Sequence, residues 1–339
     1  MKLQSQSSLF SDPQAWRAAG LAMALSALSL SALAGTFEAS TSVWAHTPDV
    51  LDARDGQTTH AAGALSSQST ALSLQGTTQG GVSSNAWAVA GVGRVAAYAR
   101  SDARMTTSTG DVEAGTSASA RAAISDSFVI DCATCTAGSY GVLTFKVFMG
   151  GEASMTGGQN RQFTPTQSAE DDWLASMSIS AEGVPDDGPV GLPSNSFHYQ
   201  VGEHYSQYGA SQPGANLDGP FGRGLQEMSI LFAFGKPITF SLDVTAYSGA
   251  GVLAYGPGEG SAWASSWINL SQSLYWAGIS GVRDASGQAV SVFSALNGDN
   301  ADFARSFAVA AAVPEPGTWA LMLGGLGVLG AIARRRRSM

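Results

Sequence analysis

The stretch Ala86-Trp87-Ala88-Val89-Ala90 decides the fold class, because small and large side chains alternate along it. A repeat of two residues is the period of a β-strand, in which successive side chains point to opposite faces of the sheet. Phe128-Val129-Ile130, which follows Ser125-Asp126-Ser127, shows the same alternation. Further strand candidates, bounded by residues typical of turns, are 142–149, 173–181, 229–234, 238–247, 261–270 and 274–279.

Reversals between these strands are expected at four dipeptides that favour turns: Asp55-Gly56, Gly150-Gly151, Ser286-Gly287 and Asn297-Gly298. Between the two ends of the chain, no capped segment shows a sustained period of 3.6 residues. Many short strands joined by turns favour two packed sheets. The sequence therefore predicts a mostly β protein whose central part is an antiparallel β-sandwich.

The composition excludes several classes of protein. Only 13% of the 339 residues are charged, against roughly 25% in an ordinary soluble domain. The formal net charge is −9, so no basic surface for nucleic acid is expected and nucleic acid is excluded as a partner. The 41 glycines follow no G-X-Y period and heptads are absent, which excludes collagen and coiled coils.

Residues 1–34 are typical of a secretory signal peptide. Lys2 and Arg17 precede an apolar run, which ends in Ala32-Leu33-Ala34. Small residues at the first and third positions before the cut are those that signal peptidase accepts, so cleavage is expected between Ala34 and Gly35. An uncleaved membrane anchor is the alternative, but the run is shorter than the roughly 20 residues needed to span a bilayer.

The C-terminus is typical of a single transmembrane helix. Residues 318–333 carry no charge and are followed by Arg334, Arg335, Arg336 and Arg337. By the positive-inside rule these arginines stay in the cytoplasm, so the chain before the helix lies outside. Ahead of the helix, Pro314 and Pro316 hold Glu315 in an extended segment that a processing enzyme can reach.

Val313-Pro314-Glu315-Pro316, the glycine-rich apolar segment and the terminal arginines resemble, in this order, the PEP-CTERM sorting signal over residues 313–339, with the motif at 313–317 and the arginine tail at 334–337. A plain C-terminal anchor would explain the helix and the arginines but not the Pro-Glu-Pro triplet. The resemblance implies a protein exported by a Gram-negative bacterium, recognised by an exosortase and associated with exopolysaccharide or biofilm. An intermediate anchored in the inner membrane, with a periplasmic ectodomain, would then reach the cell surface or the medium.

Between the two signals, the expected ectodomain carries 11 basic and 24 acidic residues, a net charge of −13 over residues 35–313. Residues 35–81 are rich in Ser, Thr, Gln and Gly, which predicts a loosely ordered arm or weak edge strands. The sandwich is expected over residues 82–312. Within it, the five prolines between residues 183 and 224 predict a long excursion.

Cys132 and Cys135 are the only cysteines, and three interpretations compete for them. A redox pair of the thioredoxin type requires a helix in a βαβ unit, and the flanking sequence indicates strand, turn and strand instead. A structural zinc site requires two further ligands at matching spacing, which are absent nearby. A disulfide that closes a hairpin loop in an oxidising compartment is the favoured interpretation.

No metal or other cofactor is expected. His198 and His204, with Glu203 beside the second, lack a third matched ligand, and Gly202 between them can break the strand. The acidic stretches 170–172 and 297–302 could bind calcium weakly, but the second fails the EF-hand pattern at Ala301. Solvated histidines and acidic turns are the simpler interpretation.

No enzyme is predicted, because nucleophile and nucleotide motifs are incomplete. Gly209-Ala210-Ser211-Gln212-Pro213 has Pro where a nucleophile elbow needs Gly, and Gly91-Val92-Gly93 lacks the third glycine of a dinucleotide loop.

We expect an exported surface or extracellular-matrix protein with a structural or adhesive role. A secreted hydrolase is a third hypothesis.

A carbohydrate-binding, lectin-like module is the second hypothesis, since aromatic side chains can stack on sugar rings. Packing in the core is the alternative role for the same side chains. Trp263 and Trp267 are four residues apart on one expected strand, so their side chains would lie on the same face of it. The other candidates are Trp87, Trp173, Trp276, Tyr199, Tyr205 and Tyr208.

Overall fold

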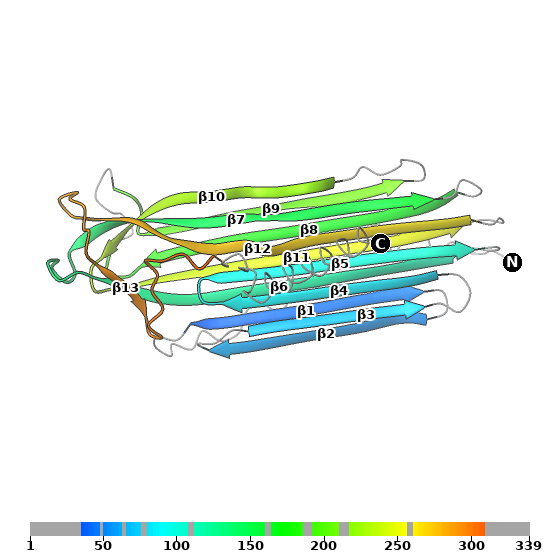
Figure 1. Ribbon diagram of the computed structural model, residues 1–339, viewed down its shortest axis with the longest axis horizontal. Coiled ribbons are helices and arrows are strands. Elements are labelled where there is room, and N and C mark those ends of the chain that lie inside the picture. Colours follow the sequence, from blue (N-terminus) through cyan, green and yellow to red (C-terminus); the bar gives the residue numbers. More distant parts are fainter. Residues whose placement is uncertain are drawn as a thin grey trace, which may run out of the picture. The chain divides into compact units, whose positions relative to one another are not determined.

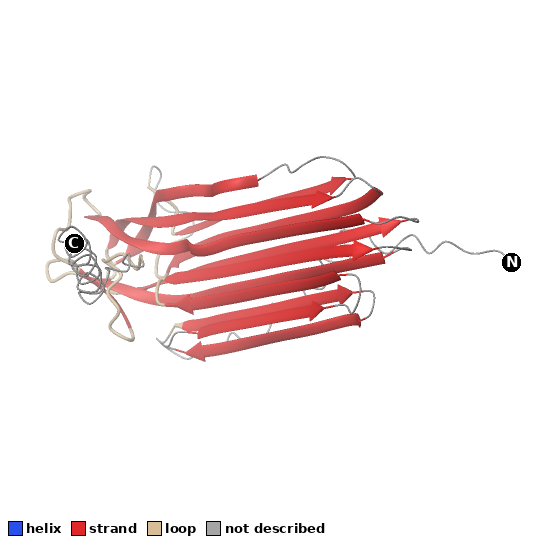
Figure 2. Cartoon of the chain, turned by 45° about the vertical axis from the view of Figure 1, so that its right-hand side comes forward, coloured by secondary structure: helices blue, strands red, loops and turns tan. Residues whose placement is uncertain are grey.

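The computed structural model describes residues 35–47, 50–62, 66–75, 80–107, 112–159, 164–185, 192–209, 217–255 and 260–308. Within these residues the chain forms thirteen strands and no helix (Figure 2). The expected signal peptide, the expected transmembrane helix and the whole sorting signal with its arginine tail lie outside the described residues.

All but one of these strands are 10 to 25 residues long, which exceeds the mean of about 5–6 residues in globular proteins. β13 has only four residues. The strands are β1 (Thr36–Thr47), β2 (Val50–Ala62), β3 (Ser66–Gln75), β4 (Gly80–Gly91), β5 (Arg94–Thr107), β6 (Val112–Asp131), β7 (Tyr140–Gln159), β8 (Thr164–Ala181), β9 (Ser196–Gly209), β10 (Leu217–Ala233), β11 (Pro237–Tyr255), β12 (Gly260–Asp284) and β13 (Ser294–Asn297).

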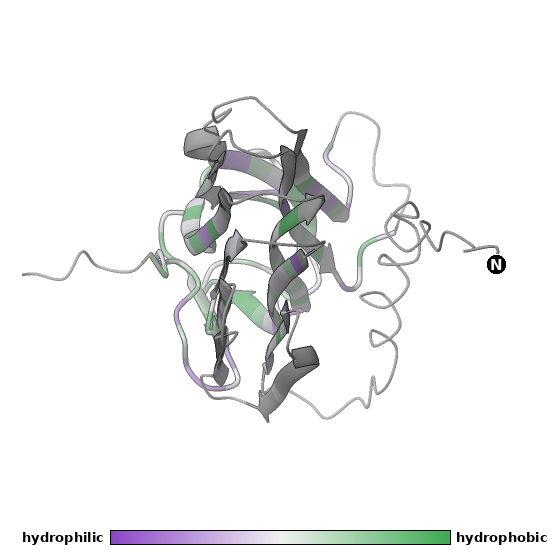
Figure 3. Ribbon diagram, turned by 90° about the vertical axis from the view of Figure 1, so that its right-hand side faces the viewer, coloured by the Kyte–Doolittle hydropathy of each residue, from purple (hydrophilic) through white to green (hydrophobic). Residues whose placement is uncertain are grey.

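The strands form two antiparallel sheets. The seven-stranded sheet has the order β2-β1-β6-β11-β8-β9, with β13 paired to β6, and the six-stranded sheet has the order β10-β7-β12-β5-β4-β3 (Figure 1). Many neighbours are distant in sequence: β1 lies beside β6, and β5 lies beside β12. One cluster of buried side chains from both sheets fills the space between them, which confirms the antiparallel β-sandwich. Figure 3 views the strands from one end.

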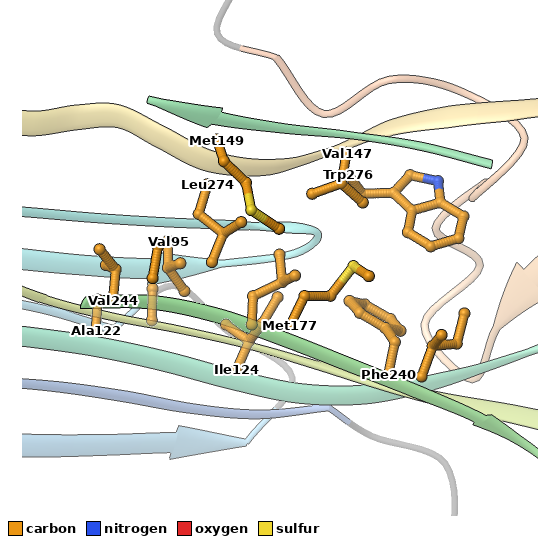
Figure 4. Close-up of a cluster of buried hydrophobic side chains, with 14 of the residues drawn as sticks. Val95, Ala122, Ile124, Val147, Met149, Met177, Phe240, Val244, Leu274 and Trp276 are labelled. Atoms are coloured by element: carbon orange, nitrogen blue, oxygen red, sulfur yellow. The ribbon is translucent and has the colours of Figure 1, made fainter. Parts of the chain in front are cut away.

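The alternation of residues along each strand separates an inner face from an outer face. On β6, Ala118, Ala120, Ala122 and Ile124 are buried, whereas the residues between them are partly exposed. Close to the connection between β6 and β7, the core consists mainly of large aromatic and aliphatic side chains (Figure 4). Trp276 stacks on Phe145 with ring centroids 4.9 Å apart, and its Nε1 donates a hydrogen bond of 2.7 Å to the carbonyl of Phe303.

A polar layer interrupts this core between the sheets. Ser84, Ser101 and Ser266 are cross-strand partners in one row of the six-stranded sheet, and Asp171 and Ser248 are partners in the seven-stranded sheet. All five are buried. Beyond this layer lies a second cluster made mostly of small side chains: Ala45, Val82, Ala103, Met105, Ala114, Ala250, Val252, Ala262 and Ala264.

Two segments for which loose structure was one expectation contain strands. Residues 35–81 contain β1, β2, β3 and the start of β4, because their Ser, Thr and Gln residues alternate with inner residues such as Phe37, Ala39 and Val43. β2 and β3 lie at the edges of the two sheets. The 183–224 segment contains β9 and the start of β10. Pro220 is accommodated in β10 because this strand is also an edge, where a missing N–H costs little.

Two of the expected reversals are turns and two are not. Ser286-Gly287 and Asn297-Gly298 lie in or beside turns, and Gly287 has a φ of +82°. Asp55-Gly56 lies within β2, and Gly150-Gly151 lies within β7. The register of β7 shifts near Gly150 against both neighbours, β10 and β12. Glycine suits such an irregularity in a strand, so this pair accompanies bulges instead of a turn.

Candidate functional site

The outer face of the six-stranded sheet carries a strip of aromatic and charged side chains. On β5 the buried residues Ala97, Ala99 and Ala103 point inward, so the alternate positions point outward. The same alternation brings Trp87 of β4 and Trp263 and Trp267 of β12 to this outer face. We call the resulting group the aromatic strip: Trp87, Tyr98, Arg100, Asp102, Arg104, Trp263 and Trp267.

Each tryptophan of the aromatic strip lies directly opposite a residue of β5. Trp263 is the cross-strand partner of Arg104, and Trp267 is the partner of Arg100. Directly opposite residues have Cβ atoms about 4.5–5.5 Å apart. Trp87 and Tyr98 are also partners, and their rings stack with centroids 6.1 Å apart. The side chain of Trp263 is 41% exposed, which is unusual for a residue of this size.

The tryptophans considered for sugar stacking therefore divide into two groups. Trp87, Trp263 and Trp267 lie on the outer face, whereas Trp173 and Trp276 are fully buried in the core. Tyr199 is partly buried and packs against the core. The side chains of Tyr205 and Tyr208 lie outside the described part of the structure.

Asp102 organises the charged part of the aromatic strip. Its Oδ2 accepts a hydrogen bond of 2.7 Å from Arg100 Nε, and its Oδ1 accepts one of 2.7 Å from Ser265 Oγ. The hydrogen bond with Asp102 raises the pKa of the Arg100 guanidinium above its ordinary value. Arg104 is exposed and makes no ion pair with the residues that the structure describes.

The outer face of the seven-stranded sheet is chemically different. It is rich in hydroxyl side chains, such as Ser178 and Ser241, whose oxygens are 2.7 Å apart. Among its described residues, Arg121 is bound by Asp243 and lies 3.4 Å from Glu38 Oε1. The hydrogen bond with Asp243 raises the pKa of Arg121. The charge of Arg121 is thus compensated by two carboxylates.

The charged members of the aromatic strip, Arg100, Asp102 and Arg104, are not among the candidate residues named from the sequence. The signal that could have found them is their alternation with small residues along β5, which places all three on one face of the strand. Their position opposite Trp263 and Trp267 could not be found in this way, since β5 and β12 are separated by more than 150 residues.

Cys132 and Cys135 form a disulfide in the connection between β6 and β7. The loop is further closed by backbone hydrogen bonds, including one of 2.8 Å from Gly138 N to the carbonyl of Phe234. Both cysteines are partly buried and pack against the core. This connection contains no helix, so the arrangement that activates a thiol at a helix N-terminus is absent from it.

The histidine candidates lie on one edge strand. β9 runs from Ser196 to Gly209 and pairs with β8 without a register shift, so Gly202 does not interrupt it. His198 is exposed, and the side chains of Glu203 and His204 lie outside the described residues. Among the described residues, no three His, Cys, Asp or Glu side chains are grouped closely enough to hold a metal ion.

Residues 170–172 lie within β8 and do not form the solvated turn that the sequence suggested. Asp171 is completely buried in the polar layer, where its Oδ1 accepts a hydrogen bond from Ser266 Oγ. Its Oδ2 has no hydrogen-bond partner among the described residues. Burial raises the pKa of Asp171 to about 7. Asp171 lies on the same face of β8 as the buried residues Trp173 and Ala175, since these positions are two and four residues away. This alternation is the signal that could have predicted its burial between the sheets.

The second acidic stretch is organised by Asn297. The side-chain Oδ1 of Asn297 accepts a hydrogen bond of 2.7 Å from Ala301 N, and its Nδ2 donates one of 2.9 Å to Asp126 Oδ2. Burial raises the pKa of Asp126 above its ordinary value. These contacts attach the turn after β13 to β6.

Gly91-Val92-Gly93 forms the tight connection between β4 and β5, where Gly93 has a φ of +62°. A Cβ at Gly93 would lie 2.2 Å from Phe307 Cδ2, so packing as well as conformation requires glycine here. Gly209 is the last residue of β9, and the remainder of the elbow-like sequence lies outside the described residues.

In the described part of the chain, no helix has the length and apolarity needed to cross a membrane. Residues 312–337 match the family model of the PEP-CTERM protein-sorting motif. The matched segment contains Val313, the Pro314-Glu315-Pro316 triplet and all four terminal arginines. Comparison with curated proteins and with solved structures gives no match.

Proposed function

Because the chain carries a PEP-CTERM protein-sorting motif at residues 312–337, we propose that an exosortase sorts it to the cell surface or the extracellular matrix, where its β-sandwich has a non-enzymatic, structural or adhesive role. The motif is the observation that carries this proposal. An exopolysaccharide is the proposed partner at the destination, and exosortase and signal peptidase are the processing partners.

The sandwich supports a structural role through its dimensions and composition. Its strands are long, all but one having 10 to 25 residues. Small side chains and hydroxyl groups dominate the outer face of the seven-stranded sheet. Such a surface presents many hydrogen-bonding groups to an extracellular polymer without requiring a catalytic centre.

Replacement of Pro314, Glu315 and Pro316 by Ala tests the sorting route. We expect the variant to stay with the membrane fraction, because the processing enzyme would no longer recognise it, while the wild-type protein appears in the medium. The measurement is immunodetection of the protein and its size in both fractions. A Ser286→Ala variant in an exposed turn is the control. Unchanged release and size of the triple variant would contradict the proposal.

Carbohydrate binding is the second candidate function, and the exposure of Trp263 on the aromatic strip favours it. An exposed aromatic face can contact the apolar face of a sugar ring. We expect binding on a glycan array that persists at high salt and is weakened in Trp263→Ala and Trp267→Ala variants. Absence of signal for the wild-type protein on every glycan would remove this candidate.

A further inference from the structure

Positive charge is concentrated on one part of an acidic protein. Residues 35–313 have a net charge of −13. Four neighbouring segments of the six-stranded sheet, namely β3, β4, β5 and residues 260–270 of β12, contain only three arginines and one aspartate as charged residues. These are Arg94, Arg100, Arg104 and Asp102, which give this region a net charge of +2.

Two of the arginines of this region form cross-strand pairs with tryptophans. Arg104 lies opposite Trp263, and Arg100 lies opposite Trp267. Positions four residues apart on a strand are separated by about 13 Å. The two pairs are therefore too far apart to contact one sugar ring together, and they lie along one direction, so that separate units of one linear chain could reach both.

Each pair combines two kinds of recognition. The indole ring offers an apolar face to a sugar ring, and the guanidinium offers a planar set of donors that matches a carboxylate. Arg100 is held in place by Asp102, which also accepts a hydrogen bond from Ser265. Arg104 is exposed and has no described ionic partner. Arg104 is thus the cation best placed to meet a charged ligand.

We infer that the aromatic strip binds an acidic polysaccharide, with Trp263 and Trp267 against its sugar rings and Arg104 against its carboxylates. This inference rests on the carbohydrate-binding function proposed above and specifies the class of ligand. Charge complementarity selects the ligand, because a polymer with negative charges would be attracted to this strip and repelled by the rest of the protein.

Nucleic acid is a less suitable ligand for the same strip. Duplex DNA carries one negative charge per about 1.7 Å, whereas the strip offers two arginine positions about 13 Å apart. The remaining net negative charge of the protein would oppose so dense a polyanion. An acidic polysaccharide carries its charges further apart and can place sugar rings over both tryptophans.

The test compares one polymer in two charge states. The full-length protein, purified in mild detergent, is titrated with polygalacturonate and with its fully methyl-esterified form, and binding is measured by biolayer interferometry. Four variants are compared: Arg104→Gln, Trp263→Ala, Trp267→Ala and the control Arg305→Gln. Arg305 is exposed and lies outside the six-stranded sheet, so its variant makes the same charge change elsewhere. Far-UV circular dichroism verifies that each variant is folded.

We expect the wild-type protein to bind polygalacturonate more tightly than the ester. The Arg104→Gln variant should lose up to about fivefold in affinity for the acidic form and keep its affinity for the ester, since an exposed charge contact is weak. Both tryptophan variants should lose affinity for both forms, by about fivefold or more. Arg305→Gln should behave as wild type.

Three results would overturn the inference, and they separate its failure from that of the proposed functions. Equal wild-type affinity for both forms would leave carbohydrate binding intact and remove the preference for acidic chains. No binding to either form would be evidence against carbohydrate binding as well, and it would leave exosortase sorting untouched. Tighter binding of a DNA oligonucleotide than of polygalacturonate would make the strip a nucleic-acid surface.

Discussion

At the scale of single residues, Asp171 differs most from what its type suggests. A carboxylate in an acidic stretch is normally solvated, but Asp171 lies between the sheets beside Ser248 and Ser266. The hydroxyl of Ser266 donates a hydrogen bond to one carboxyl oxygen of Asp171, and the other oxygen has no hydrogen-bond partner among the described residues. A buried carboxyl in this environment favours its neutral form, because the charged form loses its hydration without gaining a cation.

The raised pKa of Asp171 predicts a specific dependence of stability on pH. Below about pH 4 the carboxyl is protonated in both the folded and the unfolded state. Between about pH 4 and about pH 7 the unfolded state releases the proton and the folded state retains it. The free energy of unfolding should therefore decrease as the pH rises through this window and become constant above it.

An Asp171→Asn variant should lack this contribution, since its amide does not titrate. Denaturant unfolding at pH 5 and pH 8 should show a wild-type decrease that is larger than that of the variant by roughly 2 to 3 kcal/mol. The other buried carboxyl with a raised pKa, Asp126, is present in both proteins and cancels in this comparison. Asp172→Asn, an exposed neighbour, is the control. Parallel pH profiles for wild type and Asp171→Asn would show that Asp171 ionises normally.

At the scale of elements, the connections near the aromatic core are the most constrained. The disulfide closes the connection between β6 and β7, and Asn297 attaches the turn after β13 to Asp126 of β6. Phe303, which follows that turn, packs against Phe128 with ring centroids 4.9 Å apart. These connections join β6, β7 and β13 at one end of the sandwich, where side chains are largest.

The disulfide should contribute modestly to stability, because it closes a loop of only four residues. Loop-closure entropy for this length is about 2 kcal/mol, so the Cys132→Ser, Cys135→Ser double variant should lose up to about this amount. Far-UV circular dichroism of the double variant should keep the β spectrum, since the strands on both sides pair independently of the bridge. Denaturant unfolding measures the loss.

Mass spectrometry of the exported protein should find this pair oxidised. A reduced pair, or rapid exchange with added thiols, would instead indicate a redox-active role for Cys132 and Cys135.

At the scale of the whole molecule, charge and processing signals are distributed unevenly. Six of the 17 basic residues lie in the two terminal segments, at Lys2, Arg17 and 334–337. The described sandwich starts at Gly35, with β1 beginning one residue later. A cut after Ala34 would therefore leave β1 intact.

The mature protein is expected to begin at Gly35. Intact-mass and N-terminal peptide analysis of the exported protein should identify this terminus, because Ala32 and Ala34 are the small residues that signal peptidase requires. An Ala34→Arg variant should keep its signal segment and show a higher mass. A mature terminus elsewhere, or an uncleaved wild-type protein, would contradict this prediction.

Much of the strand content could be predicted from local sequence. The alternation in 86–90 and in 173–181 lies within β4 and β8. Residues 35–81 were harder to predict, because Ser, Thr and Gln are weak strand signals when they occur without large apolar neighbours. In the fold they are stabilised by pairing: β1 lies between β2 and β6, and the edge strands β2 and β3 each pair with one neighbour. Hydrogen bonding between strands compensates for low intrinsic preference.

The candidate site could be predicted only in part. The even spacing between Trp263 and Trp267 indicated that they share one face of a strand. For Trp173 and Trp276, alternation along their strands could not show that the face on which each lies is buried. Alternation distinguishes two faces of a strand but does not say which face meets the other sheet. That choice depends on the buried area summed over all strands of the sandwich.

The sequence by itself determined the period of the strands, the acidic charge and the PEP-CTERM motif, because each is a property of neighbouring residues in the chain. Only the tertiary structure decided which strands pair, that Asp171 lies between the sheets, and that Arg104 stands opposite Trp263. These features depend on contacts between residues far apart in sequence, whose formation is governed by the packing of two whole sheets and not by any local pattern.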